Sequence, residues 1–183
     1  MELASAAPHA ATTGLDVVVS SVASDSHTWN LIFLQLLLEE LGHRVTNLGA
    51  CVPDQLLVEH CRDRRPDLVV ISSVNGHGAV DGRRVVARLR AEPELAGLPV
   101  VIGGKLGISG AGNRRHVSGL LQAGFDAVFD DSTGLGAFHS FVGALPTGRP
   151  RLPGAERRSG ARELAGARDL SGALALTAAG AGS

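Results

Sequence analysis

LDVVVSSV, residues 15–22, is a nearly continuous apolar segment that is rich in β-branched residues and ends in small ones. Such a segment is typical of a strand that is buried on both faces of a parallel sheet. Two similar segments follow it, DLVVIS at 67–72 and LPVVIG at 98–103. Shorter strand candidates lie at 44–48 and 125–129. The sequence therefore predicts five strands.

Helical segments are expected after each of these strands, at 30–42, from Pro53 to about Arg64, at 81–91, at 114–123 and at 133–144. Strands that alternate with helices predict an α/β fold, a five-stranded doubly wound parallel sheet, with 2-1-3-4-5 as the natural strand order. The first helix is apolar on almost every side, so we expect it to be buried on several faces and to end at Gly42. Right-handed crossovers place the loops after the first, third and fourth strands at the carboxyl edge of the sheet, where a ligand is expected.

Composition narrows the class of protein. The chain has 183 residues and a formal net charge of −1, so no strong field attracts nucleic acid or acidic membranes. Aromatic residues are few, which argues against a platform for stacking bases. Cys51 and Cys61 do not have the spacing of a metal-binding pair. We interpret both as free thiols, either in the core or on the surface. With no signal-peptide pattern and no apolar segment long enough to span a bilayer, we expect a cytoplasmic protein without membrane contact.

The ends of the chain differ from its middle. Residues 1–13 are rich in alanine, and residues 146–183 contain seven glycines and three prolines but no aromatic residue. A composition of this kind buries too little apolar surface to fold. We therefore expect one domain over residues 14–145, between a disordered N-terminus and a disordered tail.

Three loops with unusual residues fall at the expected ligand edge, at 24–30, 72–78 and 103–110. In the first, Asp25 and His27 lie two residues apart. A carboxylate that accepts the Nδ1–H of an imidazole fixes its tautomer and leaves Nε2 as a metal ligand. With one such histidine, the metal would need its other ligands from elsewhere, for instance from a macrocycle. On this loop alone, the better-supported alternative is that Asp25 caps the following helix and His27 is a surface residue.

The order Asp25-x-His27, then Ser72-Ser73-Val74, then Gly103-Gly104 resembles the DxHxxG…SxL…GG pattern of the cobalamin-binding module of B12-dependent mutases and methionine synthase. Within that superfamily the chain is most similar to the small (sigma) subunit of methylaspartate (glutamate) mutase, over about residues 14–145. The resemblance implies a flavodoxin-like, Rossmann-like B12-binding domain.

On this resemblance, His27 is the axial cobalt ligand and Asp25 is its partner. Ser72 would hydrogen-bond the buried benzimidazole of the nucleotide tail, and Gly103 with Gly104 would give that tail room. The cofactor-binding residues expected from the three loops are Ser24, Asp25, Ser26, His27, Thr28, Ser72, Ser73, Val74, Gly103, Gly104, Lys105, Leu106 and Gly107. No catalytic residue is expected on this chain.

Two positions depart from the family pattern. Val74 replaces the leucine of SxL, which is a conservative change. Asn30 replaces the glycine three residues after the histidine. Asparagine tolerates left-handed backbone and can cap a helix. It can also narrow the slot for the tail.

The implied function is that of the cobalamin-binding subunit of an isomerase that uses adenosylcobalamin, as in the conversion of glutamate to 3-methylaspartate. The chain leaves no room for a TIM barrel, which needs ~200 residues or more. The resemblance therefore implies a hetero-oligomer with a separate catalytic subunit of the TIM-barrel type. Trp29, His77 and the apolar first helix are the expected contact with that partner.

Two other classes of function stay open. A corrinoid carrier for methyl transfer usually has a helical cap ahead of the binding module, and only about 14 residues precede the first strand here. The other class is non-catalytic, either a B12-sensing regulator or a receiver-like signalling domain. A receiver would need clustered acidic residues after the first strand, where the sequence has Asp25 and little else.

Overall fold

The computed structural model describes residues 14–107, 113–130 and 134–146. Its strands are β1 (Asp16–Ser21), β2 (Arg44–Asn47), β3 (Leu68–Ser72), β4 (Val100–Gly104) and β5 (Ala127–Asp130). All neighbouring pairs are parallel, and the strand order is β2-β1-β3-β4-β5. The predicted sheet and its order are confirmed.

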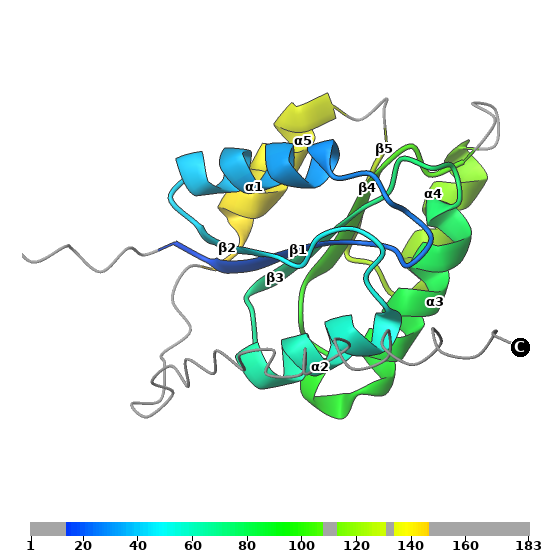
Figure 1. Ribbon diagram of the computed structural model, residues 1–183, viewed down its shortest axis with the longest axis horizontal. Coiled ribbons are helices and arrows are strands. Elements are labelled where there is room, and N and C mark those ends of the chain that lie inside the picture. The colour runs from blue at the N-terminus through cyan, green and yellow to red at the C-terminus, as the bar shows by residue number, and fades with distance from the viewer. Residues whose placement is uncertain (1–13, 108–112, 131–133, 147–183) are drawn as a thin grey trace, which may run out of the picture. The chain divides into compact units, whose positions relative to one another are not determined.

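Helices cover both faces of this sheet (Figure 1). They are α1 (Trp29–Glu40), α2 (Asp54–Arg64), α3 (Gly78–Ala91), α4 (Asn113–Ala123) and α5 (Gly134–Ala144), with a short 3-10 helix η1 (Pro93–Leu95). Helices α1 and α5 lie on one face, and α2, α3 and α4 lie on the other. In the described part of the chain, no helix is long and apolar enough to cross a membrane.

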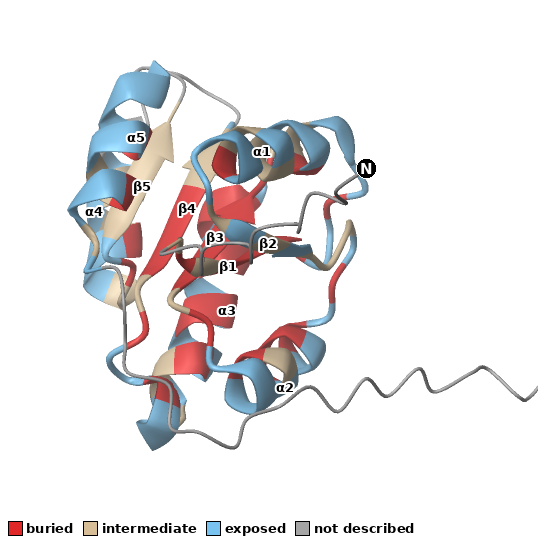
Figure 2. Cartoon of the chain, turned by 90° about the vertical axis from the view of Figure 1, so that its left-hand side faces the viewer, coloured by how far each residue is buried: buried red, intermediate tan, exposed pale blue. Residues whose placement is uncertain are grey.

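The central strands form the core, as the burial colours in Figure 2 show. One apolar cluster lies under α1 and α5, and a second lies under α2, α3 and α4. The register aligns Ser21 with Ser72 and Ser72 with Gly103. The carboxyl ends of β1, β3 and β4 therefore stop side by side, which places the loops after them at one edge.

Some boundaries differ from those expected. Helix α3 begins at Gly78, three residues before the expected start, because the backbone N–H of Ala79 is held by the carbonyl of Leu106 after β4, at 3.0 Å. Helix η1 was not expected at all. The terminal segments expected to be disordered lie outside the described residues, apart from Pro146.

The expectation that the first helix is buried on several faces is wrong. Helix α1 buries Leu31 and Leu38 against the sheet. Its opposite face carries a stripe of large apolar side chains that are 42% to 83% exposed, namely Trp29, Ile32, Phe33 and Leu36. Their spacing of three and four residues puts them on one side of the helix. Helix α1 therefore has two apolar faces, and the described chain covers one of them.

The two cysteines have different surroundings, and we expect different reactivity. Cys51 is exposed, whereas Cys61 is fully buried and burial raises the pKa of its thiol to about 12. Because the thiolate is the reactive form, a thiol reagent at neutral pH should label one cysteine per folded chain. The second should react only in denaturant. Cys51→Ser should remove the fast reaction, and equal labelling rates for both thiols would contradict this assignment.

Candidate functional site

The loops after β1 and β3 are joined at the carboxyl edge by the side chain of Asp25. This carboxylate is fully buried. Its Oδ1 accepts hydrogen bonds from the backbone N–H of His27 at 3.0 Å and from the Nδ1 of the same residue at 2.7 Å. Its Oδ2 accepts from the backbone N–H groups of Val74, at 2.6 Å, and Asn75, at 3.2 Å. The carboxylate is thus held by donors from both loops.

These contacts keep Asp25 ionised. Burial by itself raises the pKa of Asp25, but hydrogen bonds from the backbone of His27 and Val74, the ring of His27 and the hydroxyl of Ser73 together lower it below its ordinary value. A carboxylate that is anionic and fixed on all sides can only accept the Nδ1–H of His27. The Nε2 of that ring is then the unprotonated nitrogen in the neutral imidazole.

The alternative that Asp25 caps the first helix is wrong. Thr28 is the N-cap residue of α1 and makes no side-chain capping hydrogen bond, and the backbone donors of the Asp25 carboxylate in the described chain all lie outside this helix. The side chain of His27 is 58% exposed, and its Nε2 makes no hydrogen bond to any residue that the structure describes. An oriented imidazole with a free nitrogen can bind a metal or accept a proton.

The backbone of Asp25 is anchored by the loop after β2. Its carbonyl accepts hydrogen bonds from the N–H of Cys51 at 2.9 Å and from the hydroxyl of Ser21 at 3.2 Å. Cys51 has a φ of 53°, in the left-handed region. This contact was missed from the sequence, since the pairing of β2 with β1 brings the two loops together and no residue pattern signals it.

A second set of side chains ties the first loop to α3. The amide of Asn75 donates to the carbonyl oxygen of Ser24 at 2.9 Å and to its hydroxyl at 3.0 Å. The hydroxyl of Ser24 donates in turn to Asp81, which pairs with Arg84. Asn75 and Asp81 were not expected as site residues. The Asn75-Gly76 pair signals a turn, but nothing in the sequence signals a cross-link over 51 residues.

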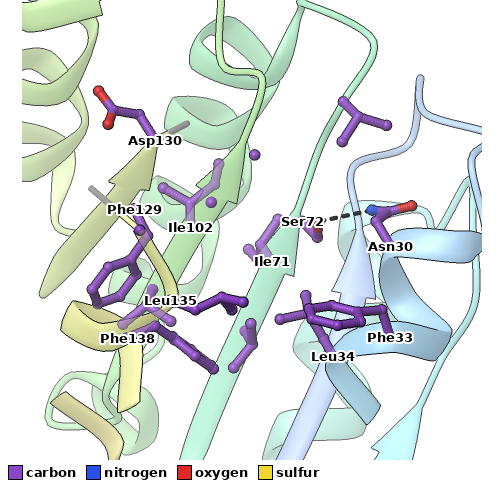
Figure 3. Close-up of a pocket in the computed structure, with 16 residues that line it drawn as sticks. Asn30, Phe33, Leu34, Ile71, Ser72, Ile102, Phe129, Asp130, Leu135 and Phe138 are labelled. Atoms are coloured by element: carbon purple, nitrogen blue, oxygen red, sulfur yellow. Dashed lines mark hydrogen bonds between the residues drawn. The ribbon is translucent and has the colours of Figure 1, made fainter. Parts of the chain in front are cut away.

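A cavity of about 320 Å³ lies beside these loops, between α1 and α5 and above the ends of β3, β4 and β5 (Figure 3). Its wall is mostly apolar, formed by Phe33, Leu34, Val70, Ile71, Val74, Val101, Ile102, Phe129, Leu135 and Phe138, together with Asn30, Ser72, Gly103, Gly104, Asp130 and Gly134. The size and the few polar groups are typical of a pocket for an organic ligand.

The predicted glycine pair lies at the wall of this cavity. Gly104 has a φ of 101°, and a Cβ at this position would come within 2.4 Å of the carbonyl oxygen of Ser73. The glycine is therefore needed for the backbone itself. A Gly104→Val substitution would therefore strain this loop before its side chain could fill the cavity.

The structure also corrects the expected role of Asn30. It is the second residue of α1, with neither a capping role nor a positive φ. Its side chain lies at the cavity wall, where its Nδ2 donates to the hydroxyl of Ser72 at 2.7 Å. The position that is glycine in the family pattern thus adds an amide to the cavity.

The structure divides the expected binding residues into groups. Ser72, Val74, Gly103 and Gly104 line the cavity, and Asp25 with His27 lies outside its wall, in the loop after β1. The others are not part of this wall: Ser24, Ser26, Thr28 and Lys105 are exposed, Ser73 and Leu106 are buried, and Gly107 packs near His116. Ile108, Ser109 and Gly110 of the third loop lie outside the described residues.

The site fits the cofactor expected from the sequence. Within residues 14–107, 113–130 and 134–146, no group of three or more histidine, cysteine, aspartate or glutamate side chains is placed to hold a metal ion. One oriented histidine beside a mostly apolar cavity suits cobalamin, whose macrocycle supplies most ligands of its metal and whose nucleotide tail needs room.

Comparison with known proteins agrees with this fit. Residues 15–111 match the family model described as B12 binding domain. The chain is 31% identical to the glutamate mutase sigma subunit of Halobacterium salinarum over 133 residues, which is 72% of this chain and 85% of that subunit. It is also 39% identical to the HTH-type transcriptional repressor CarH of Myxococcus xanthus over 88 residues, 48% of this chain and 29% of that repressor.

Solved structures support the fold. A cobalamin-binding protein from Desulfitobacterium hafniense is 24% identical, with a TM-score of 0.56, and the match covers 70% of this chain and 59% of that one. The receiver domain of a histidine kinase from Syntrophus aciditrophicus has the same TM-score at 19% identity, over 79% of this chain and 99% of that one. At these identities both matches show a shared fold alone.

Proposed function

The chain belongs to the B12-binding domain family, and on that premise we propose that it binds cobalamin with His27 as the axial cobalt ligand. One observation carries this proposal. The buried carboxylate of Asp25 holds Nδ1 of His27 at 2.7 Å and leaves Nε2 free, beside a cavity edged by Gly103 and Gly104. Asp25 orients the imidazole, and the cavity takes the nucleotide tail.

We further propose that the chain is the small subunit of a carbon-skeleton mutase of the glutamate mutase type, and that its cofactor is adenosylcobalamin. Support comes from the similarity to sigma subunits along 85% of their length. When bound, adenosylcobalamin supplies the radical that starts the rearrangement. This chain holds and orients the cofactor, and a separate catalytic subunit of the TIM-barrel type holds the substrate and excludes water.

The exposed apolar stripe on the outer face of α1 supports the proposal of a partner subunit. Trp29 is 83% exposed and Leu36 is 60% exposed, next to Ile32 and Phe33. Contiguous apolar surface of this kind marks interaction sites. The stripe begins two residues after His27, so a subunit that covers the cofactor would also cover this face.

Assembly and turnover test this proposal together. The chain, adenosylcobalamin and a cognate catalytic subunit should convert glutamate or a related amino acid, and neither chain should do so alone. A Trp29→Ala/Leu36→Ala variant should bind cobalamin normally and associate at least about tenfold more weakly, because it loses apolar contact. Leu121→Ala, which removes a similarly exposed leucine on α4, is the control. Turnover by this chain alone would contradict the two-subunit arrangement.

A regulatory module is the second candidate, favoured by the 39% identity to a transcriptional repressor. The chain would then bind cobalamin through the same site without serving a catalytic subunit. Cobalamin binding with no turnover in any cognate mixture would favour this candidate or the methyl carrier.

The cavity can be tested without disturbing Gly104. Leu135 lines it from α5 and is 49% exposed, so Leu135→Trp can fill the space from the surface. We expect the affinity for cobalamin to fall about tenfold, or about 1.4 kcal/mol, by competition for the tail's space. Equilibrium titration of the cofactor's visible spectrum measures this loss.

Two controls accompany that measurement. Cobinamide lacks the nucleotide tail and should bind parent and variant equally. Leu121→Trp places the same side chain on α4, outside the cavity, and should bind cobalamin like the parent. An equal loss for cobalamin and cobinamide would show that the tail does not enter this cavity.

A further inference from the structure

Asn30 and Ser72 form a hydrogen-bonded pair in the cavity wall. Asn30 belongs to the first turn of α1, and Ser72 ends β3. The amide Nδ2 of Asn30 lies 2.7 Å from the Oγ of Ser72, and Figure 3 shows the two side chains pointing toward each other. The rest of the wall near them is apolar, so this pair is well placed to recognise a polar atom of a ligand.

The orientation of the amide decides what the hydroxyl can do. The Oδ1 of Asn30 points away from Ser72 in Figure 3, and it is buried without a hydrogen-bond partner in the described part of the chain. If the amide were rotated by 180°, its Oδ1 would face Ser72 and its two N–H groups would be buried where no described group accepts their hydrogen bonds. Burying two unsatisfied N–H donors costs more free energy than burying one unsatisfied carbonyl oxygen. The amide nitrogen therefore faces Ser72.

An amide N–H can only donate, so the oxygen of Ser72 must accept. Its own hydrogen is then directed elsewhere, and no residue in the described ranges accepts it. The cavity is the remaining direction. A hydroxyl that accepts one hydrogen bond also becomes a stronger donor.

We propose that Asn30 fixes Ser72 as a hydrogen-bond donor into the cavity and so makes the site selective for nucleotide tails whose base carries an unprotonated ring nitrogen. The proposal rests on the proposed function, since it assigns the cavity to the tail of the cofactor. Asn30 acts here as a positioning residue. With glycine at this position, the hydroxyl would be free to donate or accept, and the selectivity would be weaker.

Reversing the hydrogen bond tests the proposal. Asn30→Asp keeps the shape but can only accept, so the hydroxyl of Ser72 turns toward it and no longer donates into the cavity. Asn30→Leu removes the bond altogether. The probes are cobalamin, whose benzimidazole has a ring nitrogen, a phenolyl cobamide, whose nucleotide tail carries a phenol ring without any ring nitrogen, and cobinamide, which has no tail.

The quantity to measure is the ratio of the affinities for cobalamin and for the phenolyl cobamide. We expect Asn30→Asp to lower it about tenfold, the effect of one hydrogen bond, and Asn30→Leu to lower it less. Repulsion between the new carboxylate and the phosphate of the tail affects both probes and cancels in the ratio. Cobinamide affinity should not change. Gln35→Leu, which removes an amide from α1 outside the cavity wall, should leave the ratio unchanged.

Each contrary result has its own meaning. An unchanged ratio in Asn30→Asp, while His27 still coordinates cobalt in every variant, would overturn the role of Asn30 and leave the proposed function standing. An equal gain of affinity for both tailed cofactors in Asn30→Gly, with no change in the ratio, would show that Asn30 acts only by its size. Failure of His27 to coordinate any of the three corrinoids in the parent would overturn both proposals.

Discussion

His27→Ala is expected to remove the protein-derived nitrogen from cobalt and to lower the affinity for cobalamin by at least about tenfold. The imidazole is 58% exposed and its ring bonds only to Asp25 among the described residues, so the free energy of unfolding should change by less than about 1 kcal/mol. The variant therefore separates ligand binding from folding. Electron paramagnetic resonance of the bound cob(II)alamin measures the coordination directly.

Isotope labelling makes this measurement specific. A benzimidazole nitrogen that stayed on cobalt and a nitrogen of His27 would each split the signal into triplets. In protein labelled with ¹⁵N-histidine, a His27 ligand gives a doublet, whereas a benzimidazole ligand leaves the triplet unchanged. His77→Ala, at an exposed residue of the loop after β3, is the control and should keep the splitting of the parent. A triplet that survives the labelling would rule out His27 as the ligand.

Asp25→Ala is expected to destabilise the folded chain by about 2–4 kcal/mol. The backbone N–H groups of Val74 and Asn75 lose their acceptor, and an unsatisfied buried donor costs ~1–3 kcal/mol. At ~2–4 °C per kcal/mol for a chain of this size, thermal unfolding should shift down by roughly 5–15 °C. Asp63→Ala, at an exposed aspartate of α2, should shift it by little.

Asp25→Asn distinguishes the two roles of this carboxylate. The amide oxygen can still accept from the loop after β3, so stability should recover in part. The imidazole loses the anionic partner that orients it, and cobalamin affinity should fall by about 10- to 100-fold. Full stability in Asp25→Ala would show that the carboxylate does not hold the loops together. Full affinity in Asp25→Asn would show that it does not orient His27.

The sheet could be predicted because its signal is local. Strands such as Leu68–Ser72 are apolar on both faces, and the helices between them have ordinary lengths and end signals. Alternation of the two elements leaves few topologies, and right-handed crossovers select among them. The pairing of Asp25 with His27 could also be predicted from the sequence, because two residues of one loop can contact each other whatever the rest of the fold is.

The burial of the first helix could not be predicted from its sequence. The helix is apolar on nearly all sides, and this pattern does not indicate which of its faces other elements of the fold cover. The sheet covers Leu31 and Leu38, and nothing in the described chain covers Trp29 and Leu36. Burial is a property of the neighbours of a residue, and those neighbours come from other elements.

The sequence by itself determined the five-stranded α/β domain, the edge of the sheet where a ligand is expected and the family that the chain resembles. The tertiary structure alone decided which groups meet at that edge. These are the bonds from Val74 and Asn75 to Asp25, the contact of Asn30 with Ser72 and the need for glycine at 104, and each one joins groups from different elements or loops of the fold. Such contacts depend on differences in distance of a few tenths of an ångström between segments about 30 to 50 residues apart, and they form only when the sheet brings those segments together.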